Sequence, residues 1–176
     1  MKYYKLECEN KKGGIQIDPV YQLPSIPYSI LDGKSEWMEN NKFIISKGTQ
    51  VNDVLPFDKH FGNMAISQGL KSFLELNEMT GWSCFPIEID GLKEQYYALQ
   101  ILGRSGGIIN LDEVNTSFDQ PKKRQIRKST LDGNDIFLVS GTLNVLITEK
   151  AANKIEREKF TNLTLIDTEN TFEFVD

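Results

Sequence analysis

Residues 66–87, ISQGLKSFLELNEMTGWSCFPI, hold the pattern that decides the fold. Ser67 suits the N-cap of a helix, because its hydroxyl can accept a hydrogen bond from a free amide of the first turn. Apolar residues then recur at helical spacing, at Leu70, Phe73 and Leu74. Gly81 can adopt the left-handed conformation that closes a helix. The stretch therefore predicts a strand end, a helix over about residues 68–79 and a new strand.

The same pattern occurs again 81 residues later, in residues 147–167, ITEKAANKIEREKFTNLTLID. Ser67 falls on Thr148, and Gly81 falls on Asn162, without any gap. Asparagine is the residue that best tolerates the left-handed conformation after glycine, so the substitution preserves the backbone geometry. We therefore expect two strand–helix–strand units, with a second helix over about residues 149–159 that superposes on the first.

The remaining sequence predicts mostly strands. Asp90-Gly91 lies between two alternating apolar runs, which is a strong hairpin signal, and Ser140-Gly141 lies between two more. Residues 54–61 have a mixed pattern, and residues 110–130 are polar enough to suggest a long loop. The expected class is α+β, with mixed or mostly antiparallel sheets. The expected strands are residues 2–8, 42–46, 82–89, 95–102, 135–139, 143–148, 163–167 and 171–175.

Length and composition are typical of an ordinary globular protein. With 176 residues, we expect a single domain over residues 1–176, with two half-domains (about 1–110 and 111–176) as a further division. Cys8 and Cys84 fit two buried thiols in a reducing compartment better than a disulfide. We see no secretory signal and no run long enough to span a bilayer, so we expect a cytoplasmic protein. The net charge of −5 argues against nucleic-acid binding.

One motif points to catalysis. Gly103-Arg104-Ser105-Gly106-Gly107 matches G-x-S-x-G, the turn that carries the nucleophile of many serine hydrolases. That turn needs a helix directly after it and a histidine later in the chain, but the single histidine, His60, lies upstream. A glycine-rich turn at the end of a strand is the simpler interpretation, and a small hydrolase is the alternative.

The sequence predicts neither a metal site nor a cofactor. His60 and Asp58 lack further cysteine or histidine at zinc-ligand spacing. Asp132-Gly133-Asn134-Asp135 resembles a calcium loop weakly, but the closing glutamate is absent. A turn with an Asx hydrogen bond explains these residues better.

Five cations are concentrated in residues 122–128, KKRQIRK, and without them the net charge of −5 would be −10. Lys122, Lys123 and Arg124 form either a patch for an acidic partner or a solvated loop. Trp37 lies in a polar setting and is either an anchor for a protein partner or a core residue.

Several short motifs resemble a family of small, uncharacterised bacterial immunity-like proteins of polymorphic-toxin systems. That family has a helix ending in "TG", a "GRCG"-like turn, "GxDIF", a "V(S/T)E" helix start and "LTNI". The resemblance covers about residues 63–166, and Ser105 stands where the family turn has cysteine. The corresponding residues are Thr80-Gly81, Gly103-Arg104-Ser105-Gly106, Gly133 with Asp135-Ile136-Phe137, Ile147-Thr148-Glu149 and Phe160-Thr161-Asn162-Leu163.

The resemblance implies a non-catalytic cytosolic protein that binds a toxin of its own cell and blocks it, without a cofactor. An interaction module for another protein partner is a further alternative. We expect a protein partner, no nucleic acid and no membrane, and the sequence leaves the oligomeric state open. The candidate partner-binding residues are Trp37, Arg104, Asp135, Lys122, Lys123 and Arg124.

Overall fold

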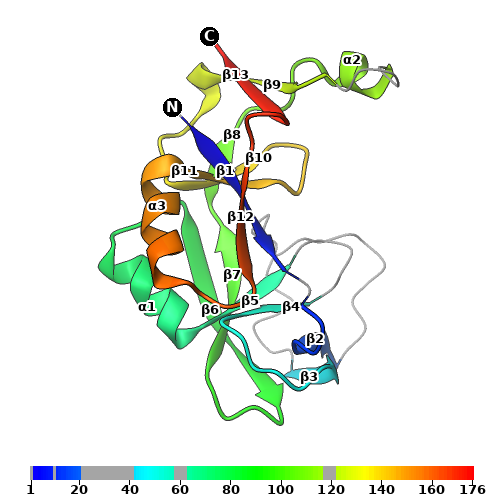
Figure 1. Cartoon of the computed structure of the whole chain (residues 1–176), viewed down its shortest axis with the longest axis vertical. Coiled ribbons are helices and arrows are strands. Elements are labelled where there is room, and N and C mark those ends of the chain that lie inside the picture. The colour runs from blue at the N-terminus through cyan, green and yellow to red at the C-terminus, as the bar shows by residue number, and fades with distance from the viewer. Residues whose placement is uncertain (1, 10, 21–41, 58–62, 117–121) are drawn as a thin grey trace.

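The protein has an α+β fold that consists mostly of β-sheet, as the sequence predicts (Figure 1). The structure, a computed structural model, describes residues 2–9, 11–20, 42–57, 63–116 and 122–176. The helices are α1 (Gln68–Leu76), α2 (Leu111–Thr116), α3 (Glu149–Glu158) and a 3₁₀ turn, η2 (Lys128–Thr130). The strands are β1 (Tyr3–Cys8), β2 (Gln16–Pro19), β3 (Lys42–Lys47), β4 (Val54–Pro56), β5 (Met64–Ser67), β6 (Trp82–Asp90), β7 (Tyr96–Ile101), β8 (Gly103–Ser105), β9 (Arg124–Arg127), β10 (Ile136–Val139), β11 (Val145–Thr148), β12 (Leu163–Asp167) and β13 (Phe172–Val175).

The strands of the described residues form three sheets. The largest has the order β2-β3-β6-β7-β5-β4, and single bridges between Gly14 and Gln50 and between Ile17 and Phe57 bring its two edges together. This sheet is therefore a nearly closed barrel. The second sheet has the order β12-β1-β11-β10-β8, and the third is a parallel pair, β13-β9.

The expected duplication is present. In the first unit, β5, α1 and β6 follow one another, and in the second unit β11, α3 and β12 do the same. Ser67 accepts from the amide of Leu70 at 3.1 Å, and Thr148 accepts from the amide of Ala151 at 3.4 Å, so both predicted N-caps are confirmed. The two helices lie side by side (Figure 1).

Two further strands pair with each strand–helix–strand unit in matching positions, so the duplication covers five elements in each unit. β7 pairs with both β5 and β6, and β1 pairs in the same way with β11 and β12. Tyr96 lies opposite Ser67, and Tyr3 lies opposite Thr148, so YYALQI of β7 matches YYKLEC of β1. β4 pairs with β5, as β10 pairs with β11. We call β4, β5, α1, β6 and β7 the first half, and β10, β11, α3, β12 and β1 the second half.

The five elements of the first half are consecutive in the chain, whereas those of the second half are not. β7 follows β6 directly, whereas β1 comes from the N-terminus and completes a half whose other strands lie after residue 135. A division of the chain near residue 110 therefore does not separate the two repeated units.

Buried residues of the described segments form three core clusters. The central cluster combines both halves, since it includes Ile66, Leu70 and Leu74 of the first with Ile147, Ala151 and Ile155 of the second. A second cluster lies inside the barrel and includes Phe43, Phe57 and Tyr96. A third lies under β9 and β13 and includes Tyr3, Phe137, Ile126 and Phe172.

The predicted helix stops need correction. α1 ends at Leu76 and α3 at Glu158, and the first left-handed residues after them are Glu78 (φ 52°) and Lys159 (φ 54°). Gly81 (φ 87°) and Asn162 (φ 64°) are left-handed as expected, but they precede the next strands rather than closing the helices. Asn77 ends α1 early, because its side-chain amide donates to the carbonyl of Phe73 at 3.0 Å.

The predicted loop at residues 110–130 is also wrong in part. This segment contains α2, β9 and η2. β9 has one fully buried residue, Ile126, which packs in the third cluster, and the surrounding cations conceal the strand pattern in the sequence. In the mixed stretch 54–61, residues 54–56 form β4, and Ser105 lies in a strand, β8. No helix in the described residues is long and apolar enough to cross a membrane.

Candidate functional site

The glycine-rich turn at residues 103–107 does not present a reactive serine. Ser105 is 2% exposed, and its hydroxyl donates to the carbonyl of Gly106 at 3.0 Å. Ser140 donates to the carbonyl of Ser105. α2 begins only at Leu111, so no helix N-terminus directly follows the serine. The turn therefore lacks the geometry of a nucleophile turn.

Gly103 of this turn and Gly81 of the Thr80-Gly81 motif give room to β10. A Cβ atom on Gly81 would lie 2.0 Å from the carbonyl oxygen of Ile136, and one on Gly103 would lie 2.1 Å from the same oxygen. Gly103 also donates its amide to the carbonyl of Gly81 at 2.9 Å. Both glycines thus allow β10 to pack closely, against the backbone before β6 at Gly81 and against the start of β8 at Gly103.

Arg104 holds the same region together. Its guanidinium donates to the carbonyls of Ile101 and Gly103, and its amide donates to the carboxylate of Asp132 at 2.5 Å. Asp132 also accepts from the amide of Asn134 at 3.1 Å, which confirms the Asx turn. Partial burial opposes ionisation of Asp132, but these backbone hydrogen bonds prevail and lower its pKa. Arg104 therefore has a structural role here.

Asp135 links the two halves. One carboxylate oxygen accepts from the hydroxyl of Thr148 at 3.3 Å. The other accepts from the amide of Thr80 at 3.2 Å and from its hydroxyl at 3.3 Å. The hydroxyl of Thr80 in turn accepts from the amide of Asp135 at 3.0 Å. We call Asp135, Thr148 and Thr80 the Asp135 clamp.

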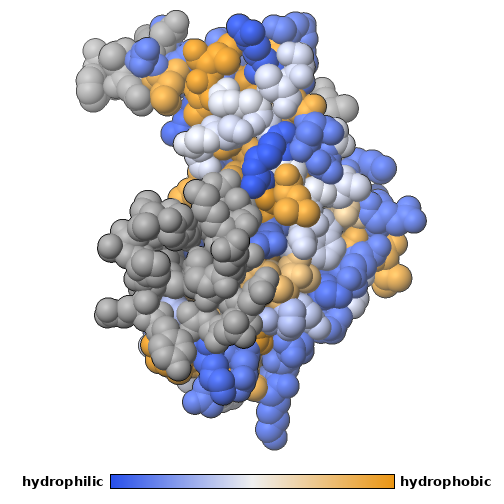
Figure 2. Space-filling model, turned by 180° about the vertical axis from the view of Figure 1, so that it is seen from behind, coloured by the Kyte–Doolittle hydropathy of each residue, from blue (hydrophilic) through white to orange (hydrophobic). Residues whose placement is uncertain are grey.

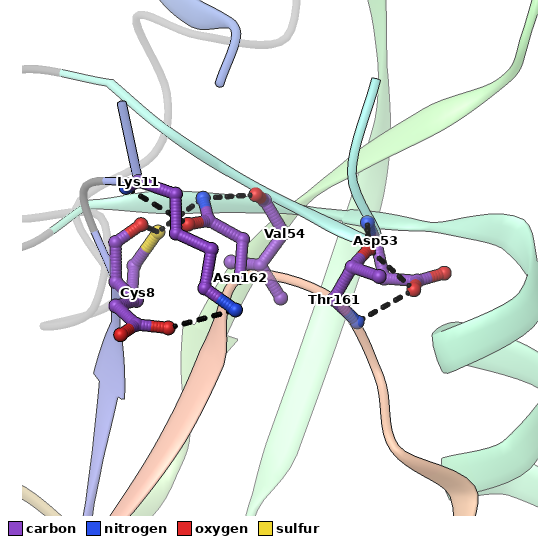
Figure 3. Close-up of polar contacts among 7 residues, drawn as sticks. Cys8, Lys11, Asp53, Val54, Thr161 and Asn162 are labelled. Atoms are coloured by element: carbon purple, nitrogen blue, oxygen red, sulfur yellow. Dashed lines mark hydrogen bonds and ion pairs between the residues drawn. The ribbon is translucent and has the colours of Figure 1, made fainter. Parts of the chain in front are cut away.

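Asp53, directly before β4, forms the matching clamp at the equivalent position of the first half (Figure 3). One carboxylate oxygen accepts from the hydroxyl of Ser67 at 2.9 Å. The other accepts from the amide and the hydroxyl of Thr161, both at 2.8 Å. We call Asp53, Ser67 and Thr161 the Asp53 clamp. Sequence reasoning missed Asp53, although it lies 82 residues before Asp135 and so follows the repeat within one residue.

Asn162 occupies the position equivalent to Gly81 and adds a further link. Its side-chain amide donates to the carbonyl of Val54 at 2.8 Å and to the sulfur of Cys8 at 3.4 Å (Figure 3). Cys8 and Cys84 are both free thiols. Burial raises the pKa of Cys8 to about 12, so this thiol remains protonated near neutral pH and is a poor nucleophile.

The basic residues lie at one end of the molecule, on and beside β9 (Figure 1). Lys122 and Lys123 are exposed. Arg124 is half-buried, and its guanidinium lies 5.8 Å from the ring centre of Phe172 on β13. Lys128 pairs with Asp176 at 2.8 Å. A hollow of about 560 Å³ beside this strand is lined by three lysines, Lys2, Lys123 and Lys128, and by three glutamates, Glu149, Glu169 and Glu173.

The six candidate residues therefore separate into groups. Arg124 lies in β9 and Lys122 and Lys123 directly precede it, while Arg104 and Asp135 belong to the contacts around β10. Trp37 lies outside the described residues, as do Asp58 and His60. In the part of the chain that the structure describes, no group of three or more His, Cys, Asp or Glu side chains could hold a metal ion.

The geometry thus defines a sheet-rich α+β protein of two related halves, with a basic strand at one end. Neither a scan of protein-family models nor a search of curated proteins finds a match to this chain.

Proposed function

We propose that this protein is a non-catalytic binding protein that neutralises a toxin of its own cell by direct contact. The proposal starts from the sequence resemblance over residues 63–166 to immunity-like proteins. Its location would then be the cytoplasm, where such a toxin must be blocked before export. The observation that carries the proposal is the burial of Ser105 in the one motif typical of hydrolases, together with the exposed cations Lys122, Lys123 and Arg127 on and beside β9.

The motifs of the resemblance have a clear structural meaning. Thr80, Asp135, Thr148 and Thr161 are clamp residues, and Gly81 and Gly103 make room for β10. These motifs therefore describe a shared frame rather than a reaction. In such a family, recognition of different toxins would rest on residues outside the frame.

A co-expression experiment tests the proposed function. The C-terminal domain of the protein encoded directly upstream is produced in a bacterial host, with and without this chain. We expect growth arrest by that domain alone, recovery with this chain and a stoichiometric complex on size-exclusion chromatography. Continued growth arrest and no complex would refute the immunity role, and capture of an unrelated protein would favour the alternative interaction module.

Replacement of Ser105 by alanine separates binding from hydrolysis. Among the described residues, the adjacent Gly106 carbonyl is the one hydrogen-bond partner of the Ser105 hydroxyl. We therefore expect Ser105→Ala to protect cells as well as the wild type. The free energy of unfolding should fall by about 1 kcal/mol or less. The measurement is growth of the co-expression strain, with denaturant unfolding as a control for stability. Loss of protection by a stably folded variant would favour the hydrolase alternative.

A further inference from the structure

The two halves have the same five elements in the same arrangement. The segments outside these elements are therefore the candidates for specific recognition of a partner. β2 and β3 extend the sheet of the first half, next to β6. The parallel pair β9 and β13 instead packs against the second half, in the third cluster. Figure 1 shows β9, β13 and α2 at the opposite end of the molecule from β2 and β3. The basic residues therefore lie on and beside β9, outside the repeated elements of the two halves, at one end of the molecule.

The alternation of β9 separates its cations into two sets. Ile126 is fully buried, and Arg124 on the same face covers Phe172. Successive side chains of a strand point to opposite faces, so Gln125 and Arg127 share the other face, and Lys123 lies directly before the strand. Lys123 and Arg127 are exposed, and neither has a charged partner among the described residues. They lie about 13 Å apart along the strand.

Apolar side chains lie beside this basic face. The amide of Ile109 donates to the carbonyl of Gln125 at 3.0 Å, which places Ile109 along the edge of β9 that does not pair with β13. Ile109 and Leu111 are each 49% exposed. Figure 2 shows blue and orange atoms next to one another at this end of the molecule. We call Lys123, Arg127, Ile109 and Leu111 the β9 surface.

We infer that the β9 surface binds an extended acidic segment of the partner protein, in which carboxylates four residues apart meet Lys123 and Arg127 and an apolar side chain meets Ile109. The inference rests on the proposed function for the identity of the partner. Complementary charge supports it: without the cations of residues 122–128 the net charge of −5 would be −10. An acidic partner is repelled by most of this protein and attracted at one end, which fixes its orientation.

The neighbouring acids favour a protein segment over a nucleic acid. Gln125 donates to Glu173 at 2.8 Å, and Lys128 pairs with Asp176 at 2.8 Å, so carboxylates stand next to the two unpaired cations. A continuous phosphate backbone would have to pass these carboxylates. A protein segment can instead place discrete carboxylates on the two cations and polar or apolar side chains between them.

A matched pair of charge reversals tests the inference with the upstream-encoded toxin domain. Lys123→Glu with Arg127→Glu should raise the Kd by about 10- to 100-fold, since two attractive contacts become repulsive. The control, Lys47→Glu with Lys93→Glu, changes the net charge equally at exposed sites of β3 and the β6–β7 turn. It should change the Kd by less than about twofold, because distant charges are screened by salt. Equal weakening by both variants would overturn the inference, as would an unchanged Kd for the β9 variant.

A second measurement does not depend on the toxin. A nine-residue peptide with glutamate at its third and seventh positions, leucine at its fifth and no other charge is titrated into the isotope-labelled protein. We expect amide chemical shifts to move at β9, β13 and Ile109, and to remain unchanged in the Lys123→Glu, Arg127→Glu variant, whose dispersed spectrum shows that it is folded. Shifts elsewhere, no shifts, or tighter binding of a DNA duplex than of the peptide would overturn the inference. If the toxin domain fails to bind while the peptide moves these signals, the proposed function fails and the β9 surface stands.

Discussion

Replacement of Gly81 by alanine should destabilise the protein by about 4 kcal/mol or more, at the upper end of single substitutions. Two costs combine at this position. Gly81 has φ 87°, a conformation that L-residues rarely adopt. Its Cβ atom would also lie 2.0 Å from the carbonyl oxygen of Ile136, which is backbone and cannot turn aside. Relief would require β6 and β10 to separate, and that would open the contact between the halves. Denaturant unfolding measures the loss.

Gly133→Ala is the matched control for this prediction. Gly133 has φ 82°, yet a Cβ atom there would meet nothing within 4 Å. This variant should lose only about 1–2 kcal/mol, which is the conformational cost alone. Equal losses at the two positions would contradict the close packing of Gly81 against β10.

Asp53→Ala and Asp135→Ala should each cost about 2–4 kcal/mol, because each removes a carboxylate that accepts three hydrogen bonds. The two losses should be similar, since the clamps have the same arrangement. The Asp53 clamp ties β4 and the start of α1 to the segment before β12. The Asp135 clamp ties β10 and the start of α3 to the segment before β6.

An exposed aspartate provides the control for the clamps. Asp90, at the end of β6, is exposed, and Asp90→Ala should change the free energy of unfolding by less than about 0.5 kcal/mol. Thermal unfolding of the three variants and the wild type supplies the comparison. A loss at Asp53 or Asp135 no larger than that at Asp90 would show that the clamps do not join the halves.

Local patterns predicted much of this fold. Ser67 and Thr148 were identifiable as N-caps because capping depends on residues three positions apart. The Asp90-Gly91 hairpin was identifiable because glycine chemistry determines the turn, and Gly91 has φ 86°. The 81-residue repeat was visible because both helices and their exits kept similar residues.

Long-range pairing was not predictable in the same way. β1 completes the second half although 127 residues, Glu9 to Asp135, lie between its end at Cys8 and the start of β10 at Ile136. The match between YYALQI and YYKLEC does not follow the 81-residue shift, so a search at a single shift misses it. β9 was concealed because four of its flanking and internal residues are cationic while only Ile126 contributes buried apolar surface.

Among the candidate site residues, too, local sequence patterns were predictable and long-range contacts were not. The cations of residues 122–124 stood out by their density in the sequence, and the structure places them at the start of β9 and directly before it. Asp135 was selected from the motif, but its carboxylate serves the Asp135 clamp. Asp53 was missed because the partners of its carboxylate, Ser67 and Thr161, lie far from it in sequence and on different halves.

Hydrogen–deuterium exchange of this protein tests the central claim most directly. It is measured alone and with the partner of the proposed function, the C-terminal domain of the protein encoded directly upstream, which the proposal takes to be the toxin domain. Amides of a bound surface exchange more slowly when a partner covers them. We predict slower exchange in β9, β13 and at residues 109–111 when the toxin domain is present, with unchanged exchange in β2, β3 and the β6–β7 turn. Unchanged exchange throughout the chain at saturating toxin domain would contradict the account, and so would protection confined to the glycine-rich turn at residues 103–107.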